Sequence, residues 1–256
     1  MACVSGWRDD FDGPELDTSV WVPSYLPVWS SRTAAAASYR LEDSCLVLDL
    51  PQDHPLWCPE EHPTPLRVSG MMSGNHSGPV GSTIGQQAIF VGQKVREEQE
   101  RFEGFLTDGG HLEVRCSMDI TPRSMAALWL CGFEDEPERC GEICVVEIFG
   151  NAVRDGSAEV GMGLKQLRDP RLVHDFAAPR LPIDPSELHT YAVDWDADEA
   201  VFTVDGELVR RTPRPPAYPL QVMIGVFDFP DDATGDPAVD RHVPSMRLDW
   251  ISTRPS

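Results

Sequence analysis

The chain is divided by turns into apolar segments of strand length, and this division constrains its fold more than any other feature. Residues 111–118 alternate apolar and polar side chains, and residues 125–133 are almost wholly apolar. The first pattern predicts a half-buried β-strand, and the second predicts a strand that is buried on both faces. A charged loop at 134–139 leads into another apolar segment at 142–149. These residues therefore predict a β-hairpin.

The same spacing of short segments continues through the rest of the chain. Residues 45–50 predict a strand, and the five prolines within 51–65 predict a loop. Asp205-Gly206 is a strong signal for a two-residue hairpin turn. The stretch 93–105 is compatible with either a helix or a charged strand. Further strands are expected at 157–164, 189–195, 200–204, 207–211, 220–229 and 246–252.

Length and composition agree with an all-β domain. The 256 residues include 20 glycines and 23 prolines that are spread along the chain, which suits many short strands joined by turns. This length is normal for one β-sandwich or barrel. We find no internal repeat and no linker, so a single domain over residues 1–256 is expected.

Charge and hydropathy exclude two classes of partner. The formal net charge of −21 argues against binding to a nucleic-acid backbone. No stretch approaches the roughly 18 apolar residues that a membrane-spanning helix needs. We therefore expect neither a nucleic-acid partner nor a membrane partner, and the sequence does not indicate an oligomeric state.

The cysteines and the N-terminal residues bear on the cellular location. The seven cysteines include no Cys-x-x-Cys pair, and the seven histidines lack the spacing of metal ligands. Neither a disulfide framework nor a zinc site is predicted. Residues 1–10 contain no apolar run of signal-peptide length. A cytoplasmic location with reduced thiols is expected, or secretion if an export signal has been removed.

The candidate site lies in the second strand of the predicted hairpin. Glu142 and Glu147 stand within a run of apolar residues, where a carboxylate is costly unless it is paired, hydrogen-bonded or used for chemistry. An offset of five places the two side chains on opposite faces of a regular strand, but one β-bulge between them brings both to one face. Two such carboxyls, about 5–5.5 Å apart, are what retaining glycoside hydrolysis requires. The alternative is an edge strand with two solvent-facing glutamates that oppose aggregation.

The run Gly141–Gly150, Gly-Glu-Ile-Cys-Val-Val-Glu-Ile-Phe-Gly, resembles the bulged signature Glu-Ile-Asp-x-x-Glu of glycoside hydrolase family 16. The resemblance implies a concanavalin A-like β-jelly-roll, a sandwich of two antiparallel sheets. Weaker similarities to the family occur in the same order along the chain, at Asp10–Gly13, Leu16–Trp21, Ala126–Leu130, Leu188–Trp195, Val204–Val209 and Met246–Ile251.

The resemblance also implies roles for individual residues. Glu142 matches the family's nucleophile and Glu147 matches its acid/base. Trp129 matches an aromatic residue near the floor of the cleft, and Asp249 matches a position that contributes to a structural calcium in many members. No cofactor is required for the reaction. Further candidates for stacking against a sugar are Trp29, Trp57 and Phe149.

Two residues depart from the family pattern. Cys144 stands where the family has an aspartate between the two glutamates, and a thiol is mostly neutral and a weak hydrogen-bond partner. It withdraws a negative charge whose repulsion helps to keep the acid/base protonated. Lys165 lies in a segment where related hydrolases are expected to carry a histidine, and we count it among the residues of the substrate cleft.

Three functions follow from these observations. The first is a retaining endo-type hydrolase of a β-linked, β-glucan-like glycan. The second is an intracellular enzyme on the same scaffold that uses the carboxylates as acid and base on a small, non-polysaccharide substrate, because one fold hosts many reactions. The third is a lectin-like carbohydrate-binding protein that has lost catalysis. The sequence does not identify the sugar or the linkage.

Overall fold

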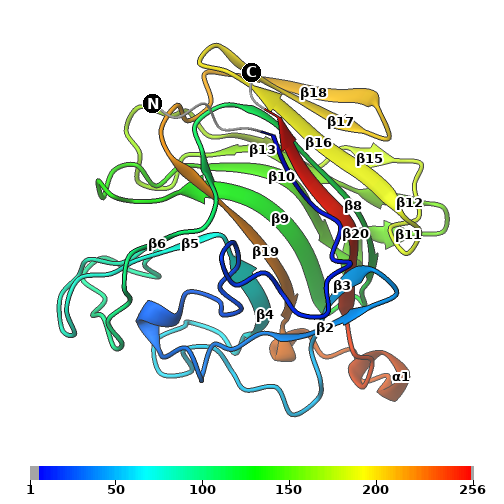
Figure 1. The fold of residues 1–256 in the computed structure, drawn as a ribbon. Coiled ribbons are helices and arrows are strands. Elements are labelled where there is room, and N and C mark those ends of the chain that lie inside the picture. The colour runs from blue at the N-terminus through cyan, green and yellow to red at the C-terminus, as the bar shows by residue number, and fades with distance from the viewer. Residues whose placement is uncertain (1–5, 255–256) are drawn as a thin grey trace.

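A computed structural model describes residues 6–254 and consists mainly of two antiparallel β-sheets packed face to face (Figure 1). Sheet A contains, in spatial order, β18 (Glu207–Pro213), β17 (Glu199–Val204), β16 (His189–Trp195), β8 (Gly110–Asp119), β20 (Ser245–Arg254), β3 (Cys45–Asp49) and β2 (Ser38–Glu42), with β1 (Trp7–Asp9) beside β20. Sheet B contains β14 (Asp175–Ala177), β13 (Gly161–Lys165), β10 (Glu142–Phe149), β9 (Ser124–Gly132), β19 (Leu220–Asp228) and β4 (Arg67–Met72), with β7 (Leu106–Thr107) beside β19.

The remaining regular elements are short. Two small sheets pair β5 (Gly74–Asn75) with β6 (Phe102–Glu103), and β12 (Ser157–Glu159) with β11 (Val153–Arg154) and β15 (Arg180–Leu181). The only α-helix in the described residues is α1 (Pro237–Asp240), where the side chain of Asp236 accepts a hydrogen bond from the backbone of Ala238. The predicted all-β sandwich of two antiparallel sheets is therefore confirmed.

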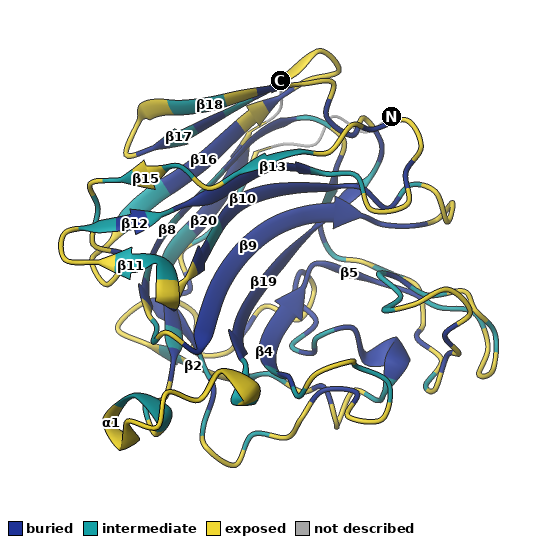
Figure 2. Ribbon diagram, turned by 180° about the vertical axis from the view of Figure 1, so that it is seen from behind, coloured by how far each residue is buried: buried dark blue, intermediate teal, exposed yellow. Residues whose placement is uncertain are grey.

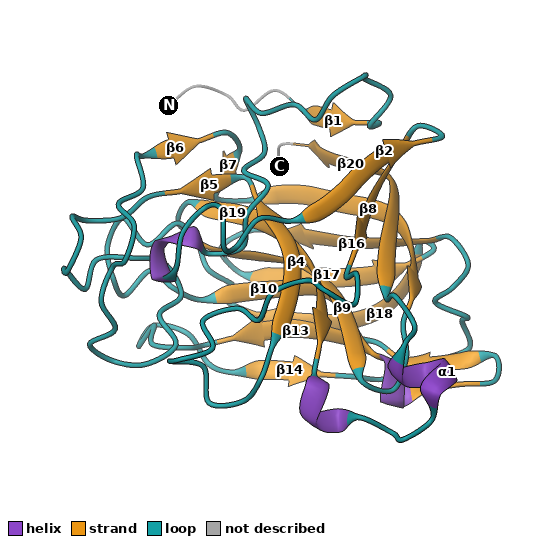
Figure 3. Ribbon diagram, turned by 90° about the horizontal axis from the view of Figure 1, so that it is seen from below, coloured by secondary structure: helices purple, strands orange, loops and turns teal. Residues whose placement is uncertain are grey.

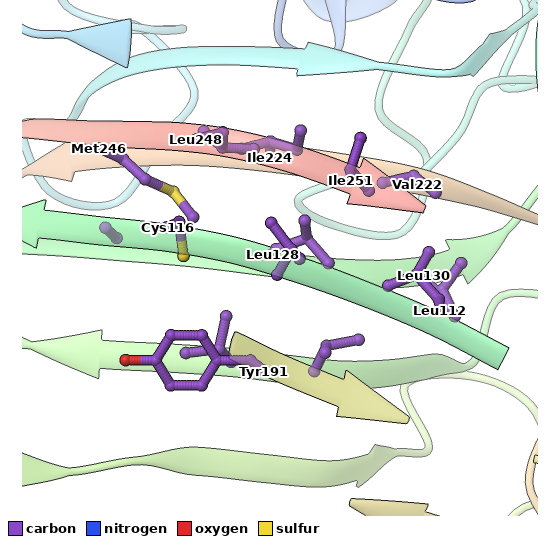
Figure 4. Close-up of a cluster of buried hydrophobic side chains, with 14 of the residues drawn as sticks. Leu112, Cys116, Leu128, Leu130, Tyr191, Val222, Ile224, Met246, Leu248 and Ile251 are labelled. Carbon is purple, nitrogen blue, oxygen red and sulfur yellow. The ribbon is translucent and has the colours of Figure 1, made fainter. Parts of the chain in front are cut away.

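The main core fills the space between the two sheets. Leu112 and Leu248 of sheet A face Leu128 and Ile224 of sheet B, and all four are fully buried (Figure 4). Along each strand, side chains that face the core alternate with side chains that face the other side of the sheet. This alternation produced the apolar–polar pattern from which strands were predicted. Burial of this apolar layer is the dominant favourable contribution to folding.

A second apolar cluster covers part of the outer face of sheet B. Met125 and Met223 of the sheet pack there with Leu26, Trp29 and other residues of the long loops in the first hundred residues. These loops fold over one side of the sandwich (Figure 3). Strands β9, β10 and β19 are consequently buried along nearly their whole length (Figure 2). The part of this face that the loops leave open forms a cleft.

The structure decides one local alternative and corrects one expectation. Residues 93–105, for which helix and strand were both open, form only the short strand β6, because other backbone groups bond to loops: the N–H of Arg96 donates to the carbonyl of Val28 at 2.9 Å. Residues 157–164 form two strands instead of one. Val160 separates these two strands, and its N–H donates to the carbonyl oxygen of Pro179. At this residue the chain passes from a small sheet into sheet B.

Other expectations concern location and domain organisation. The six cysteines within the described residues are all free, and Cys3 lies outside these residues. Within residues 6–254, no helix is long and apolar enough to cross a membrane. The single domain and the cytoplasmic location stay predictions.

Candidate active site

The two glutamates lie on a strand that carries the predicted bulge. In the register between β10 and β9, Cys144 is opposite Trp129 and Val146 is opposite Leu128, so Val145 is an extra residue. The register between β10 and β13 shifts in the same segment. A bulge of this kind bends the strand and changes the face to which the following residues point.

The bulge separates the side chains of β10 into two sets. Ile143, Val145, Val146 and Ile148 belong to the core between the sheets, so two consecutive valines point inward. The second set consists of Glu142, Cys144 and Glu147, whose side chains face the cleft. The expected arrangement of both carboxyls on one face is confirmed.

Two adjoining cavities form the cleft. The first, of about 200 Å³, is lined by Tyr25, Gln87, Met125, Ala127, Trp129, Glu142, Cys144, Glu147, Lys165 and Phe227. The second, of about 260 Å³, shares Tyr25, Gln87 and Glu142 with it and extends to Trp57, His62, Ile89 and Arg168. Glu142 thus lies where the two cavities meet.

Glu142 is a buried carboxyl group. Its side chain accepts a hydrogen bond from Nε2 of Gln87 at 2.5 Å. Burial raises the pKa of Glu142 to about 7, and the negative charge of Glu147 adds to this effect, whereas Lys165 and the Gln87 hydrogen bond oppose it. The group therefore changes its protonation state near neutral pH.

Glu147 is paired with Lys165. The Nζ atom of Lys165 lies 2.7 Å from Oε2 of Glu147 and 4.8 Å from the ring centroid of Phe176. Lys165 is also directly opposite Glu142 in the register of β13 and β10. Burial alone would lower the pKa of Lys165, but the carboxylates of Glu147 and Glu142 raise it. Lys165 is therefore a cation between the two carboxyls.

Cys144 lies between the glutamates with a neutral side chain. It is 1% exposed, and its Sγ atom lies 3.7 Å from the carbonyl oxygen of Gly161. Burial, with the charge of Glu147, raises the pKa of this thiol well above its ordinary value. A thiolate nucleophile at this position is disfavoured, because the nucleophilic form of cysteine is the ionised one.

A comparison with protein families decides the classification. The model of glycosyl hydrolases family 16 matches residues 110–251, which is more than half of the chain and includes β8, β9, β10, β13 and β19. The chain belongs to this family. It is a glycosidase.

Solved structures of glycosidases share the fold of this family 16 protein. The GlcNAcα1-4Gal releasing endo-β-galactosidase from Clostridium perfringens matches with a TM-score of 0.79 and 25% identity over 96% of this chain, which spans 61% of the length of that protein. The laminarinase from Flavobacterium sp. UMI-01 matches with a TM-score of 0.64 and 18% identity, over 97% of this chain and 98% of that chain. The comparison with curated protein sequences found no match.

Trp129 contributes an aromatic surface to the cleft of this family 16 protein. It lines the first cavity, with ring centroids of Phe227 and Tyr25 at 6.1 Å and 6.5 Å. Its Nε1 atom is buried and has no hydrogen-bond partner. Buried indole N–H groups usually find a partner, and no group of the described residues supplies one here.

The other predicted stacking residues occupy different environments. Trp57 lines the second cavity, and its Nε1 atom donates to the carbonyl of Tyr25. Trp29 is fully buried and donates to the carbonyl of Gln86, so it belongs to the loop core and lines neither cavity. Phe149 is 40% exposed, stacks on Phe229 at the end of β10, and also lines neither cavity.

Asp249, the candidate calcium ligand, is paired with a cation, and calcium binding stays a prediction. Its carboxylate pairs with Arg115 on the neighbouring strand β8. Calcium takes six to eight oxygen ligands, usually with several carboxylates. Among residues 6–254, no group of three or more His, Cys, Asp or Glu side chains converges on a point where a metal could bind.

Several cleft residues were not predicted from the sequence. Tyr25, Gln87 and Phe227 line the first cavity, and Arg168 lines the second. The aromatic character of Tyr25 was the only signal of this group, because Gln87 comes from a loop with no regular pattern. The loops of the first hundred residues thus complete a site whose two glutamates and lysine come from sheet B.

Proposed function

We propose that this family 16 protein is a retaining, endo-type hydrolase of a β-linked glycan, with Glu142 as nucleophile and Glu147 as acid/base. The observation that supports this proposal most directly is the bulge at Val145. It brings the carboxyls of Glu142 and Glu147 to the wall of one cavity. Two carboxyls on opposite sides of a scissile bond are the machinery of the retaining reaction.

In the first step, the carboxylate of Glu142 attacks the anomeric carbon of the sugar while Glu147 donates a proton to the departing oxygen. Gln87 and Lys165 both favour the ionised form of Glu142 that this attack requires. Glu147 must hold a proton at this point. The ammonium group of Lys165 therefore has to leave Glu147 when the glycan binds.

In the second step, water attacks the covalent glycosyl–enzyme intermediate and releases Glu142. Glu147 takes a proton from this water, which requires its carboxylate form. In the structure, Oε2 of Glu147 lies in an ion pair with Nζ of Lys165 at 2.7 Å. The structure without substrate therefore corresponds more closely to the base half of the cycle than to the acid half.

The walls of the cleft suit a carbohydrate. Tyr25, Trp129 and Phe227 provide aromatic surfaces, and Gln87 and Lys165 add polar groups. Sites of this kind combine apolar walls with a few placed polar groups. Both β-glucans and β-galactans belong among the candidate substrates, because laminarinases and an endo-β-galactosidase share the fold.

The test is incubation of the purified protein with β-1,3-glucan, mixed-linkage β-glucan and galactans, while new reducing ends are measured. ¹H NMR at early times identifies the anomer of the first product. We expect the β-anomer from a β-linked substrate, and a loss of about 10²–10⁴-fold or more in kcat for Glu147→Gln and Glu142→Gln.

Azide distinguishes the roles of the two glutamates. With an activated β-glycoside, azide should rescue Glu147→Ala as a β-glycosyl azide, because the covalent intermediate still forms. It should rescue Glu142→Ala as an α-glycosyl azide, by direct displacement. Exchanged product anomers would reverse the assignment. Binding of oligosaccharides without any product would overturn the hydrolase and leave a carbohydrate-binding protein.

A further inference from the structure

The loop residues Gln86 and Gln87 connect the cleft to the buried loop core. Nε2 of Gln86 donates to the carbonyl oxygen of Phe133 at 2.9 Å, and Nε1 of Trp29 donates to the carbonyl of Gln86 at 2.8 Å. Gln86 is completely buried. Both the side chain and the backbone carbonyl of the preceding residue, Gln86, are therefore fixed by hydrogen bonds.

Gln87 and Glu134 share an unfavourable backbone conformation and are bonded to each other. Their φ angles are 47° and 57°, in the left-handed region that residues with a Cβ atom rarely adopt. The N–H of Gln87 donates to Oε1 of Glu134 at 2.6 Å. Such conformations persist only where surrounding contacts enforce them, and they cluster at functional sites.

Glu134 anchors this contact from the end of β9. Its side chain is 4% exposed, and its Oε2 atom lies 3.2 Å from Nη2 of Arg168. Burial raises the pKa of Glu134 to about 7, against the opposing effects of the Gln87 N–H and Arg168. Both carboxyl oxygens are thus engaged, one by Gln87 and one by Arg168.

The backbone N–H of Gln87 bonds to Glu134, whereas its side chain bonds to the carboxyl of Glu142. Its Nε2 atom donates to Oε1 of Glu142. The opposite orientation of the amide would place two acceptor oxygens together when Glu142 is ionised. A donor on a carboxylate stabilises the charged form. Gln87 thus acts on the same carboxyl that the proposed reaction uses as nucleophile.

We propose that Gln87 is a positioning residue, which holds the Glu142 side chain in place as a carboxylate and is itself fixed by the Glu134–Arg168 pair. This assignment rests on the proposed role of Glu142 as nucleophile. It adds a contribution from a loop that lies 55 positions from Glu142 in the sequence. It also explains why two left-handed residues meet beside the cleft.

Other titratable groups lie near Glu142, and of these Lys165 lowers its pKa and Glu147 raises it. They come from β9, β10, β13 and the covering loops, and they are Tyr25, Cys131, Glu134, Cys144, Glu147 and Lys165. Substitution of Gln87 leaves all of these side chains in place. A rise in the pKa of Glu142 in a variant that adds no charge can then be attributed to the lost donor.

Two substitutions of Gln87 separate its donor role from its shape. Gln87→Gly removes the amide but suits the left-handed backbone, so its Tm should equal or exceed that of the wild type. Gln87→Glu keeps the shape but replaces the donor by an acceptor. Gln52→Ala changes an exposed glutamine that lines neither cavity and serves as control.

The primary measurement is the pKa of Glu142, from ¹³C NMR of the glutamate carboxyls, with Glu142→Gln identifying the signal. This titration needs no turnover, so it decides the inference even if every glycan fails as substrate. We expect both Gln87 variants to raise the pKa of Glu142 by about one unit or more. The acid limb of kcat/KM should move to higher pH by the same amount. A wild-type pKa in Gln87→Gly, or restoration of wild-type behaviour by Gln87→Glu, would overturn the inference.

Discussion

Nζ of Lys165 lies 2.7 Å from Oε2 of Glu147, and Lys165 is also directly opposite Glu142 on the neighbouring strand. One lysine therefore forms an ion pair with Glu147 and lowers the pKa of Glu142, the two carboxyls of the proposed reaction. Cys144 between them is neutral. In the related enzymes whose signature this segment resembles, the same position is an aspartate. This site thus replaces an additional negative charge by a neutral thiol and adds a positive charge next to it.

Lys165→Gln should move the acid limb of the pH profile. Lys165 lowers the pKa of Glu142, so its removal raises that pKa, and the carboxylate needed for attack then forms only at higher pH. We expect the acid limb of kcat/KM to shift upward by about one unit. The chain's only other lysine, the exposed Lys94, offers the matched control Lys94→Gln. A shift to lower pH would contradict this account of Lys165.

Cys144→Asp should raise the pKa of Glu142 as well, through a new negative charge on the same face of β10. The neutral, nearly isosteric Cys144→Ser should leave the acid limb in place. The aspartate should also reduce stability, because the present thiol donates to a carbonyl oxygen, which cannot donate to a carboxylate. Urea unfolding and the pH dependence of kcat/KM measure the two effects. Equal pH profiles for Cys144→Asp and Cys144→Ser would show that a charge at position 144 does not change the pKa of Glu142.

Trp129→Phe should weaken substrate binding, and the smaller ring should also cost some stability because it leaves unfilled space at a buried position. The indole N–H is buried and unpaired, so its removal leaves no partner unsatisfied in the free protein. If the N–H donates to a sugar hydroxyl, KM should rise about 5- to 10-fold. Trp195→Phe removes another buried, unpaired indole N–H, on β16 of sheet A, and should leave KM unchanged. An unaltered KM in Trp129→Phe would show that this donor does not bind substrate.

Asp228→Ala should destabilise the protein by about 3–5 kcal/mol, because it leaves a buried guanidinium without its counter-ion. Asp228 is 5% exposed and accepts two hydrogen bonds from Arg123, at 2.6 and 2.7 Å, and one from Arg67 at 3.0 Å. Asp198→Ala, at an exposed turn, should change the free energy of unfolding by less than about 0.5 kcal/mol. Urea denaturation at neutral pH compares the two. A loss below about 1 kcal/mol in Asp228→Ala would contradict the proposed importance of this ion pair.

The sequence predicted the strands and the charged part of the site because both depend on local patterns. Residues 189–195 and 125–133 carry the periodicity of buried strands, and the structure places β16 and β9 there. The bulge followed from two glutamates at an odd offset within an apolar run. The sequence also showed Cys144 as a departure before any geometry was known.

The loop side of the cleft could not be predicted, because its contacts join distant positions without a local signal. Trp29 and Trp57 occur in similar irregular segments, yet Trp29 is enclosed by the loop core and Trp57 lines the second cavity. Gln87 has no sequence pattern that connects it to Glu142. Gln99, within a stretch compatible with a helix, instead bonds through its backbone N–H to Ser77. In each case a partner far along the chain determines the conformation.

The single extra residue at Val145 makes the active-site strand tolerant of a change in length. Val145 and Val146 both point into the core, and Glu142 and Glu147 both face the cleft. Deletion of one valine would leave a strand of strictly alternating residues with the two glutamates four positions apart, still on one face. Natural insertion or loss of this residue could therefore occur without turning either carboxyl into the core. Two lengths of the same catalytic segment are compatible with one cleft.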